Sequence, residues 1–236
     1  MSSNTVNWHK YSDHISGKSR VTFGDGHVGG CNIYGDPATE VPKTWKYLVD
    51  TFNIESIIDI GCGFGFHAKY FKKNLNCEVL GIEGSKKVVE LALIPEIIHH
   101  DYTSGPFIPN KIYDFCWTIE FVEHVSDEYK QNFIEKFKKC KYLAMTHGLP
   151  GQGGYHHVNC RNPEYWIDIL SQNGFTLMHD ITQTCRDLSQ QDMNDYIKWR
   201  DDPNPNKPYR GPAAEQNDFR KNDQLEPFFA KNGMVF

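Results

Sequence analysis

The chain has 236 residues, of which 39% are hydrophobic and 23% charged, and its formal net charge is -5. This composition is typical of a folded globular domain and excludes a wholly disordered chain. The acidic balance disfavours broad electrostatic binding to nucleic acid or to an anionic membrane. No apolar run has the length of a membrane span, and the N-terminus lacks the apolar stretch of a signal peptide, so we expect a cytoplasmic protein.

The seven cysteines are odd in number and have no C-x-x-C spacing, and several lie inside apolar, strand-like runs. We therefore expect reduced, buried side chains rather than disulfides or a zinc site built from thiolates.

An N-terminal arm precedes the first periodic segment. Residues 1–38 are rich in Gly, His, Ser and Asp, and stretches such as GDGHVGG are typical of turns. We assign residues 1–40 to a loop-rich arm or lid that folds over the site, and residues 41–236 to one domain. Within that domain we expect residues 185–230 to form a largely irregular C-terminal insertion, apart from one helix over 185–200, before a short last strand in GMVF.

Strands and helices alternate regularly after Pro42, which begins the first helix. Apolar runs predict buried strands over 54–60, 77–83, 96–101, 112–119, 141–147 and 175–179. Helices are predicted over 66–74, 127–140 and 162–172. This alternation predicts an α/β fold, namely a Rossmann-like, doubly wound, mostly parallel sheet of seven strands with helices on both faces.

A glycine-rich turn follows the first of these strands. Asp59, Gly61, Cys62, Gly63 and Gly65 lie where the strand becomes a helix, and glycines there let a ligand approach the backbone closely. The third small residue of a dinucleotide-binding fingerprint is missing. The G-x-G-x-G form instead resembles motif I of class I methyltransferases, and this resemblance implies S-adenosylmethionine as the cofactor.

Two further acids close the next two strands. Glu83, followed by Gly84, ends the second strand, where a carboxylate can accept hydrogen bonds from both ribose hydroxyls. Asp101, followed by Tyr102, ends the third, where it can accept from the adenine amino group. Ligands of open α/β sheets bind outside the carboxyl ends of the strands. The turn and both acids together predict one cofactor site, although each acid alone could be a capping residue.

The segment after the fourth strand carries two glutamates and a histidine. On one helical turn Glu120, Glu123 and His124 would lie side by side. The segment resembles a form found in metal-free methyltransferases, and that resemblance implies that Glu120, its first residue, touches the cofactor. The E-x-x-E-H form resembles the metal motif of ubiquinone-pathway O-methyltransferases and small-RNA 2′-O-methyltransferases. That resemblance implies Mg²⁺ or Mn²⁺ bound by these three side chains and His157, chelating vicinal oxygens of the acceptor. The same form occurs in metal-free methyltransferases, so both interpretations stay open.

Three histidines precede the next helix. One stands at the end of the fifth strand, and two lie in the glycine-rich loop PGQGGYHHVN, residues 150–159. The unperturbed pKa of histidine suits a general base near neutral pH. The candidates for accepting the proton of an acceptor hydroxyl are His147, His156 and the neighbouring His124.

Residues 30–175 also resemble methyltransferases of phages, giant viruses and environmental sequences, several of which look like glycan-modifying enzymes. The prediction is therefore O-methylation of a polyhydroxylated small molecule or glycan, with a sugar of a glycan as first choice. The alternatives are metal-free methylation of a small molecule or an RNA 3′ end, and a non-catalytic cofactor-binding subunit. The lack of a Lys/Arg-rich run disfavours RNA. The convergent acid–base groups disfavour a non-catalytic subunit.

Overall fold

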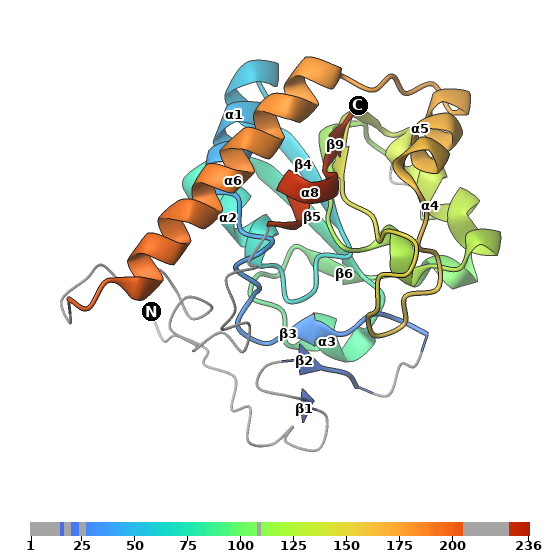
Figure 1. Cartoon of the computed structure of the whole chain (residues 1–236). Helices are drawn as coiled ribbons and strands as arrows, with labels where there is room; N and C mark the ends of the chain where they lie inside the picture. Colours follow the sequence, from blue (N-terminus) through green and yellow to red (C-terminus); the bar gives the residue numbers. More distant parts are fainter. Residues whose placement is uncertain (1–14, 17–19, 24–26, 108–109, 205–226) are drawn as a thin grey trace.

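The computed structural model describes residues 15–16, 20–23, 27–107, 110–204 and 227–236. At its centre is a six-stranded sheet with the order β6-β5-β4-β7-β8-β9 (Figure 1). Neighbouring strands are parallel except for β9, which runs antiparallel to β8 at the edge. The strands are β4 (Ser56–Ile60), β5 (Glu78–Glu83), β6 (Ile97–His99), β7 (Tyr113–Thr118), β8 (Cys140–Met145) and β9 (Met234–Val235). The predicted Rossmann-like, doubly wound α/β fold is confirmed.

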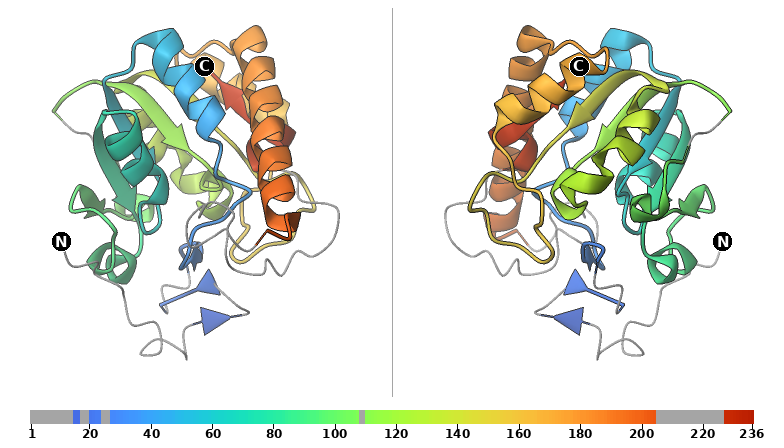
Figure 2. Two further views of the ribbon diagram at one scale, coloured as in Figure 1. Left: turned by 90° about the vertical axis from the view of Figure 1, so that its left-hand side faces the viewer. Right: turned by 90° about the vertical axis from the view of Figure 1, so that its right-hand side faces the viewer.

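Helices cover both faces of the sheet, as the two views of Figure 2 show. One face packs against α1 (Pro42–Phe52), α2 (Phe66–Asn74), α6 (His179–Asp201) and α8 (Phe228–Asn232). The other face packs against α4 (Lys130–Phe137) and α5 (Pro163–Gln172). The remaining elements are α3 (Lys86–Glu90) and the 3-10 turns η2 (Tyr102–Ser104), η3 (Val122–His124) and η4 (Asp127–Tyr129). Within the described residues, no helix combines the length and the apolarity needed to cross a membrane.

The alternation of side chains along the strands divides the core into two layers. On β4, Ile57 packs in the layer beneath α1 and α2, whereas Ile58 and Ile60 pack beneath α4 and α5. On β7, Trp117 is fully buried and stacks on Phe229 of α8, with ring centroids 5.4 Å apart. The C-terminal segment is therefore held to the sheet by an aromatic stack as well as by the β8–β9 pairing.

The prediction of a strand over 175–179 is wrong, so the sheet has six strands rather than seven. In this stretch the N–H of Met178 donates to the carbonyl of Val235 at 2.8 Å. No ladder develops between these described segments, because α6 already begins at His179.

The helix expected over 185–200 is present as the C-terminal part of α6, which begins earlier, at His179, and continues to Asp201. Residues 205–226 lie outside the described residues. The short last strand expected in GMVF is present as β9.

The N-terminal arm contains more structure than the predicted loop. Three two-residue strands, β1 (Ile15–Ser16), β2 (Arg20–Val21) and β3 (Cys31–Asn32), form a small antiparallel sheet beyond the end of the central sheet (Figure 1). In the central sheet, the order of strands reverses between β4 and β7. The carboxyl ends of these two strands therefore open the crevice in which open α/β sheets bind ligands.

Candidate active site

The glycine-rich turn connects β4 to α2 at this crevice. Gly61 has φ 71°, in the left-handed region that glycine adopts readily. A Cβ at Gly61 would also lie 2.7 Å from the ring of Phe121, which packs across the turn. Any side chain at this position would therefore displace either the turn or Phe121.

Glu83 at the end of β5 holds the turn in place. Its carboxylate accepts from the backbone N–H of Gly63 at 3.0 Å and from that of Ser85 at 2.8 Å. Burial raises the pKa of Glu83, while these N–H groups act in the opposite direction. Each carboxylate oxygen has a second lone pair, so Glu83 can support the turn and still accept from a ligand.

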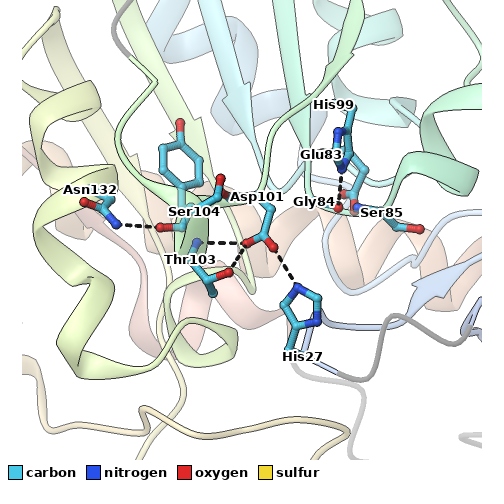
Figure 3. Close-up of polar contacts among 10 residues, drawn as sticks. His27, Glu83, Gly84, Ser85, His99, Asp101, Thr103, Ser104 and Asn132 are labelled. Carbon is cyan, nitrogen blue, oxygen red and sulfur yellow. Dashed lines mark hydrogen bonds and ion pairs between the residues drawn. The ribbon is translucent and has the colours of Figure 1, made fainter.

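Asp101, after β6, lies beside Glu83 in Figure 3. One of its oxygens accepts from the N–H and the hydroxyl of Thr103, both at 2.8 Å. The other lies 2.7 Å from Nε2 of His27, a residue of the arm (Figure 3). Burial alone would raise the pKa of Asp101, but the hydrogen bonds from Thr103 and His27 hold it below its usual value. The arm therefore reaches the carboxylate predicted to bind adenine.

Two adjoining cavities open at the carboxyl edge of the sheet. Both are lined in part by the arm, and they share Gly30, Cys31, Gly61, Glu120 and His124. The predicted cofactor residues that line the first cavity are Gly61, Glu83, Gly84, Asp101, Tyr102 and Glu120, and those that line the second are Gly61, Cys62, Gly63 and Glu120.

Two of the predicted cofactor residues, Asp59 and Gly65, line neither cavity among the described residues. Asp59 is buried beneath the turn, and burial raises its pKa to about 8, while the N–H of Ala68 acts in the opposite direction. Gly65 is the N-cap of α2, where a Cβ would collide with Ile97. Both residues support the turn from below rather than face a ligand.

Three of the four predicted metal ligands form a compact group. Glu123, His124 and His157 each offer one ligand atom, and these atoms all lie within 4.8 Å of one another. Glu123 is fully buried, and neither of its oxygens has a well-aligned hydrogen-bond partner among the described residues. Burial, and then the neighbouring charge of Glu120, raise the pKa of Glu123 well above its usual value.

Glu120 lies next to this group but not within it. Its N–H donates to Oγ1 of Thr146 at 2.8 Å, and that hydroxyl donates back to the Glu120 carboxylate at 3.0 Å. Burial raises the pKa of Glu120 to about 7. The prediction that Glu120, Glu123 and His124 share one helical turn is wrong, because Glu120 has φ 52° and η3 begins only at Val122.

The two imidazoles of the group are held by the glycine-rich loop. Nδ1 of His124 lies 3.3 Å from the carbonyl oxygen of His156. A carbonyl can only accept, so Nδ1 carries the proton and Nε2 keeps its lone pair. The rings of His124 and His157 meet edge to face, 4.9 Å apart.

Of the three candidate bases, His124 lines both cavities. His147 is fully buried, lines neither cavity, and accepts a hydrogen bond from Asn232 at its backbone carbonyl. Burial lowers the pKa of its imidazole. His156 also lines neither cavity, and it contacts His124 through its backbone oxygen. This arrangement favours His124 among the three.

Several lining residues were missed from the sequence. Within the second cavity they include Asp36 and Thr39 of the arm, His67 of α2 and Tyr155 of the glycine-rich loop. The half-buried Cys160 lies beside the metal-ligand group, with Sγ 3.7 Å from Nδ1 of His157. None of these residues belongs to a motif, although His67 directly follows the glycine-rich turn.

Comparison with known proteins bears on the central part of the chain. Residues 58–141 match the family model described as a methyltransferase domain. A segment of 87 residues is 30% identical to the chloroplastic tocopherol O-methyltransferase of Arabidopsis thaliana, covering 33% of this chain and 25% of that protein. The chain thus spans about a quarter of the length of this curated relative.

Solved structures with similar architecture include a SAM-dependent methyltransferase from Archaeoglobus fulgidus, at 20% identity and TM-score 0.48 over 60% of this chain and 70% of that one. The methyltransferase domain of bacterial CtHen1-CN is similar at 16% identity and TM-score 0.47, over 59% and 89% of the two chains. Phosphoethanolamine N-methyltransferase 2 of Haemonchus contortus, in complex with S-adenosyl-L-methionine, is similar at 18% and 0.46, over 66% and 44%.

The segment that matches the family model runs from within β4 to the start of β8. It contains the glycine-rich turn, Glu83, Asp101 and the E-x-x-E-H segment. The similarity to a methyltransferase domain therefore covers this part of the site, and the arm, the glycine-rich loop and the C-terminal segment lie outside the matched residues.

Proposed function

We propose that this chain is an S-adenosylmethionine-dependent O-methyltransferase that acts on a hydroxyl of a polyhydroxylated acceptor, with a sugar of a glycan as first choice. The observation that carries the proposal is the junction of the two cavities, which share Glu120 and His124. The carboxylates expected to bind ribose and adenine, Glu83 and Asp101, line the first cavity. His157 lines the second. A methyl donor in the first cavity would thus meet an acceptor hydroxyl beside the acid–histidine group, which consists of Glu123, His124 and His157.

Methyl transfer requires the protein mainly to align the donor with the acceptor and to remove one proton. The acceptor oxygen attacks the methyl carbon as the carbon–sulfur bond breaks, the sulfur keeps the electron pair, and S-adenosylhomocysteine leaves. Holding both reactants in line supplies most of the rate enhancement. The hydroxyl proton passes to a base, and Nε2 of His124 has the lone pair for this step when no metal is bound.

A divalent ion fits the acid–histidine group. A buried acidic group without well-aligned hydrogen-bond partners is destabilising, and Glu123 is such a group among the described residues. Glu123, His124 and His157 would hold the ion, and Glu120 lies beside them. Bound there, Mg²⁺ or Mn²⁺ would supply Lewis acidity that lowers the pKa of an acceptor hydroxyl and selects the hydroxyl that faces the methyl group.

The charge of the cavities favours a neutral acceptor. Neither cavity has a Lys or Arg among its described lining residues, whereas Asp36, Glu83, Asp101 and Glu120 are acidic. Such walls suit a cationic donor and disfavour the phosphates of an RNA 3′ end. Tyr155 lines the second cavity with 39% of its surface exposed, and its ring offers a flat apolar face to a sugar ring.

The arm would act as a lid over both ligands. Residues 27–32 line the cavities, which supports a role in excluding water during transfer. We expect residues 27–32 to close over the ligands when substrate binds. Removal of residues 1–38 should leave a folded protein with low activity, and normal kinetics of the truncated chain would contradict this role.

The test is methyl transfer to a panel of nucleotide sugars and glycans, followed by mass spectrometry before and after exhaustive chelation. Activity that is lost in EDTA and restored by Mg²⁺ or Mn²⁺ supports the full proposal. Full activity in EDTA would eliminate the metal and leave His124 as a plain base. Restoration by Zn²⁺ alone would overturn the chelation of a diol. Failure of the wild type to bind S-adenosylhomocysteine in calorimetry would overturn the proposal as a whole.

A further inference from the structure

We propose that His67 is a positioning residue that fixes the strap, residues 35–39, as the wall of the second cavity against the amino-acid end of the methyl donor. The inference rests on the proposed function, because it concerns how the donor is held. His67 is the second residue of α2, immediately beyond the glycine-rich turn, and it lines the second cavity together with Gly35, Asp36 and Thr39.

A directed chain of hydrogen bonds joins the sheet to the strap. Nε1 of Trp117 lies 3.3 Å from Nδ1 of His67, and an indole nitrogen can only donate. Nδ1 must therefore be the unprotonated nitrogen, and in a neutral ring the proton is on Nε2. Nε2 lies 3.0 Å from Oγ1 of Thr39, which accepts this proton and donates its own to the carbonyl of Asp36 at 2.9 Å.

The surroundings of His67 favour its neutral form. Its ring lies 5.3 Å from that of Trp45 and 6.3 Å from that of Trp117, and both indoles are buried. Burial lowers the pKa of His67 to about 4. A second ring proton would place two N–H groups, those of Nδ1 and of the Trp117 indole, against each other. The neutral ring with its proton on Nε2 is the form that makes both hydrogen bonds.

The strap has other anchors as well, because Ala38 is fully buried in an apolar cluster with residues of α6. Asp36 accepts from the N–H of Ala38 at 2.9 Å and from Nδ2 of Asn32 at 3.1 Å, both within the arm itself. From outside the arm, the N–H of Phe228 donates to the carbonyl of Ala38 at 3.0 Å. Thr39 receives the hydrogen bond from His67 of α2, and its loss should let this part of the cavity wall move.

The strap faces one end of the donor. Glu83 and Asp101 line the first cavity, which assigns that cavity to ribose and adenine. The rest of the donor then extends past Gly61 and Gly63 into the second cavity, where the strap lies. The carboxylate of Asp36 is near enough to Glu120 to raise its pKa, so the strap also brings negative charge to that wall. The affinity of a ligand that lacks the amino-acid end should not depend on the strap.

Two ligands separate this role from a general structural one. S-adenosylhomocysteine carries the amino-acid end, whereas 5′-methylthioadenosine has the same nucleoside and sulfur without it. We expect His67→Phe and Thr39→Val each to weaken S-adenosylhomocysteine binding about tenfold, the scale of one lost hydrogen bond. Binding of methylthioadenosine should change less than about twofold. Thr39→Ser keeps the hydroxyl and should restore affinity, and Thr51→Val on the exposed face of α1 is the matched control.

The outcomes are distinct. Equal loss for both ligands, no loss for either, or failure of Thr39→Ser to restore affinity would overturn the positioning role. If His67→Phe does not fold, the two Thr39 variants carry the test. Wild-type protein that binds neither ligand would overturn the proposed function and this inference with it.

Nuclear magnetic resonance of the wild type gives an independent readout. The ¹⁵N shifts of His67 should be those of an unprotonated Nδ1 and a protonated Nε2, constant from about pH 8 down to about pH 5.5, because the unperturbed pKa near 6.5 is shifted downward. A protonated Nδ1 at neutral pH would contradict the direction of the hydrogen-bond chain.

Discussion

The two cavities share one sheet edge but are built in different ways. The first takes its polar groups from the ends of consecutive strands, with Glu83 following β5 and Asp101 following β6. The second is assembled from distant segments: the strap, the glycine-rich loop at Tyr155 and His157, and Phe228 near the C-terminus. The comparison suggests a donor half, which is fixed mainly by local chain geometry and reaches the strap at the donor's amino-acid end, and an acceptor half at Tyr155 and His157, which is fixed by long-range packing. Substitutions in the two halves should therefore change different measured quantities.

The largest effect should come from Glu123→Gln in the acceptor half. Loss of the buried carboxylate should lower turnover about 100-fold, because metal-ion catalysis contributes several kcal/mol. Affinity for S-adenosylhomocysteine should stay within about twofold, since the donor contacts are intact. Steady-state kinetics and calorimetry check both numbers, with Glu128→Gln on the exposed turn η4 as the control. An equal loss of cofactor affinity would break the division into halves.

In the donor half, Glu83→Ala should weaken S-adenosylhomocysteine binding by about 1.5–3 kcal/mol, the range for hydrogen bonds to a charged group. The variant also frees the N–H groups of Gly63 and Ser85, so part of the loss comes from a looser turn. Glu83→Gln keeps one acceptor oxygen and should lose less. Unchanged affinity in the alanine variant would remove Glu83 from the donor site.

Asp59 tests the support beneath the donor half through pH. Its pKa is about 8 in the folded state against 3.8 for a free side chain, so between these values the folded state retains a proton that the unfolded state releases. The free energy of unfolding should therefore fall as pH rises from 4 to 8. Relative to Asp59→Asn, the wild type should lose up to about 1.4 kcal/mol per pH unit without ligand. Parallel stability curves for the two proteins would show that Asp59 titrates normally.

The smallest effect should come from Tyr155, on the wall of the acceptor half. Tyr155→Ala should raise the KM of a sugar acceptor about two- to tenfold through the loss of one ring face. Tyr155→Phe should change it less than about twofold, and cofactor affinity should be constant in both. A change in cofactor affinity instead of KM would place Tyr155 in the donor half.

The same division explains how much of the site could be predicted from the sequence. The glycine-rich turn, Glu83 and Asp101 could be placed because each follows its own apolar strand, and parallel strands end at one edge. The bond between His27 and Asp101 joins residues 74 positions apart, and no local pattern indicates it. Glu120 was expected on a helix, but its contact with Thr146 and its left-handed backbone draw it out of η3.

In the fold, the elements with a clear apolar period were predicted and α6 was only partly predicted. Several of the positions that α6 buries are polar, including Thr182, Ser189 and Asp192. Two of these have partners in α1: the N–H of Lys43 donates to Asp192 at 2.9 Å, and the hydroxyls of Thr44 and Ser189 are 2.8 Å apart. A helix that meets its neighbour through hydrogen bonds has a weak hydrophobic period, so its start was assigned to a strand.

The contact between His27 and Asp101 has a consequence for the timing of catalysis. His27 lies 2.7 Å from the carboxylate assigned to adenine, and both residues line the first cavity. We expect this contact to part before S-adenosylhomocysteine leaves, so that opening of the arm sets the residence time of the product. Product inhibition would then be governed by the arm rather than by the reacting groups. In stopped-flow measurements, S-adenosylhomocysteine should leave the His27→Ala variant faster than it leaves the wild type, while the rate of methyl transfer itself stays similar.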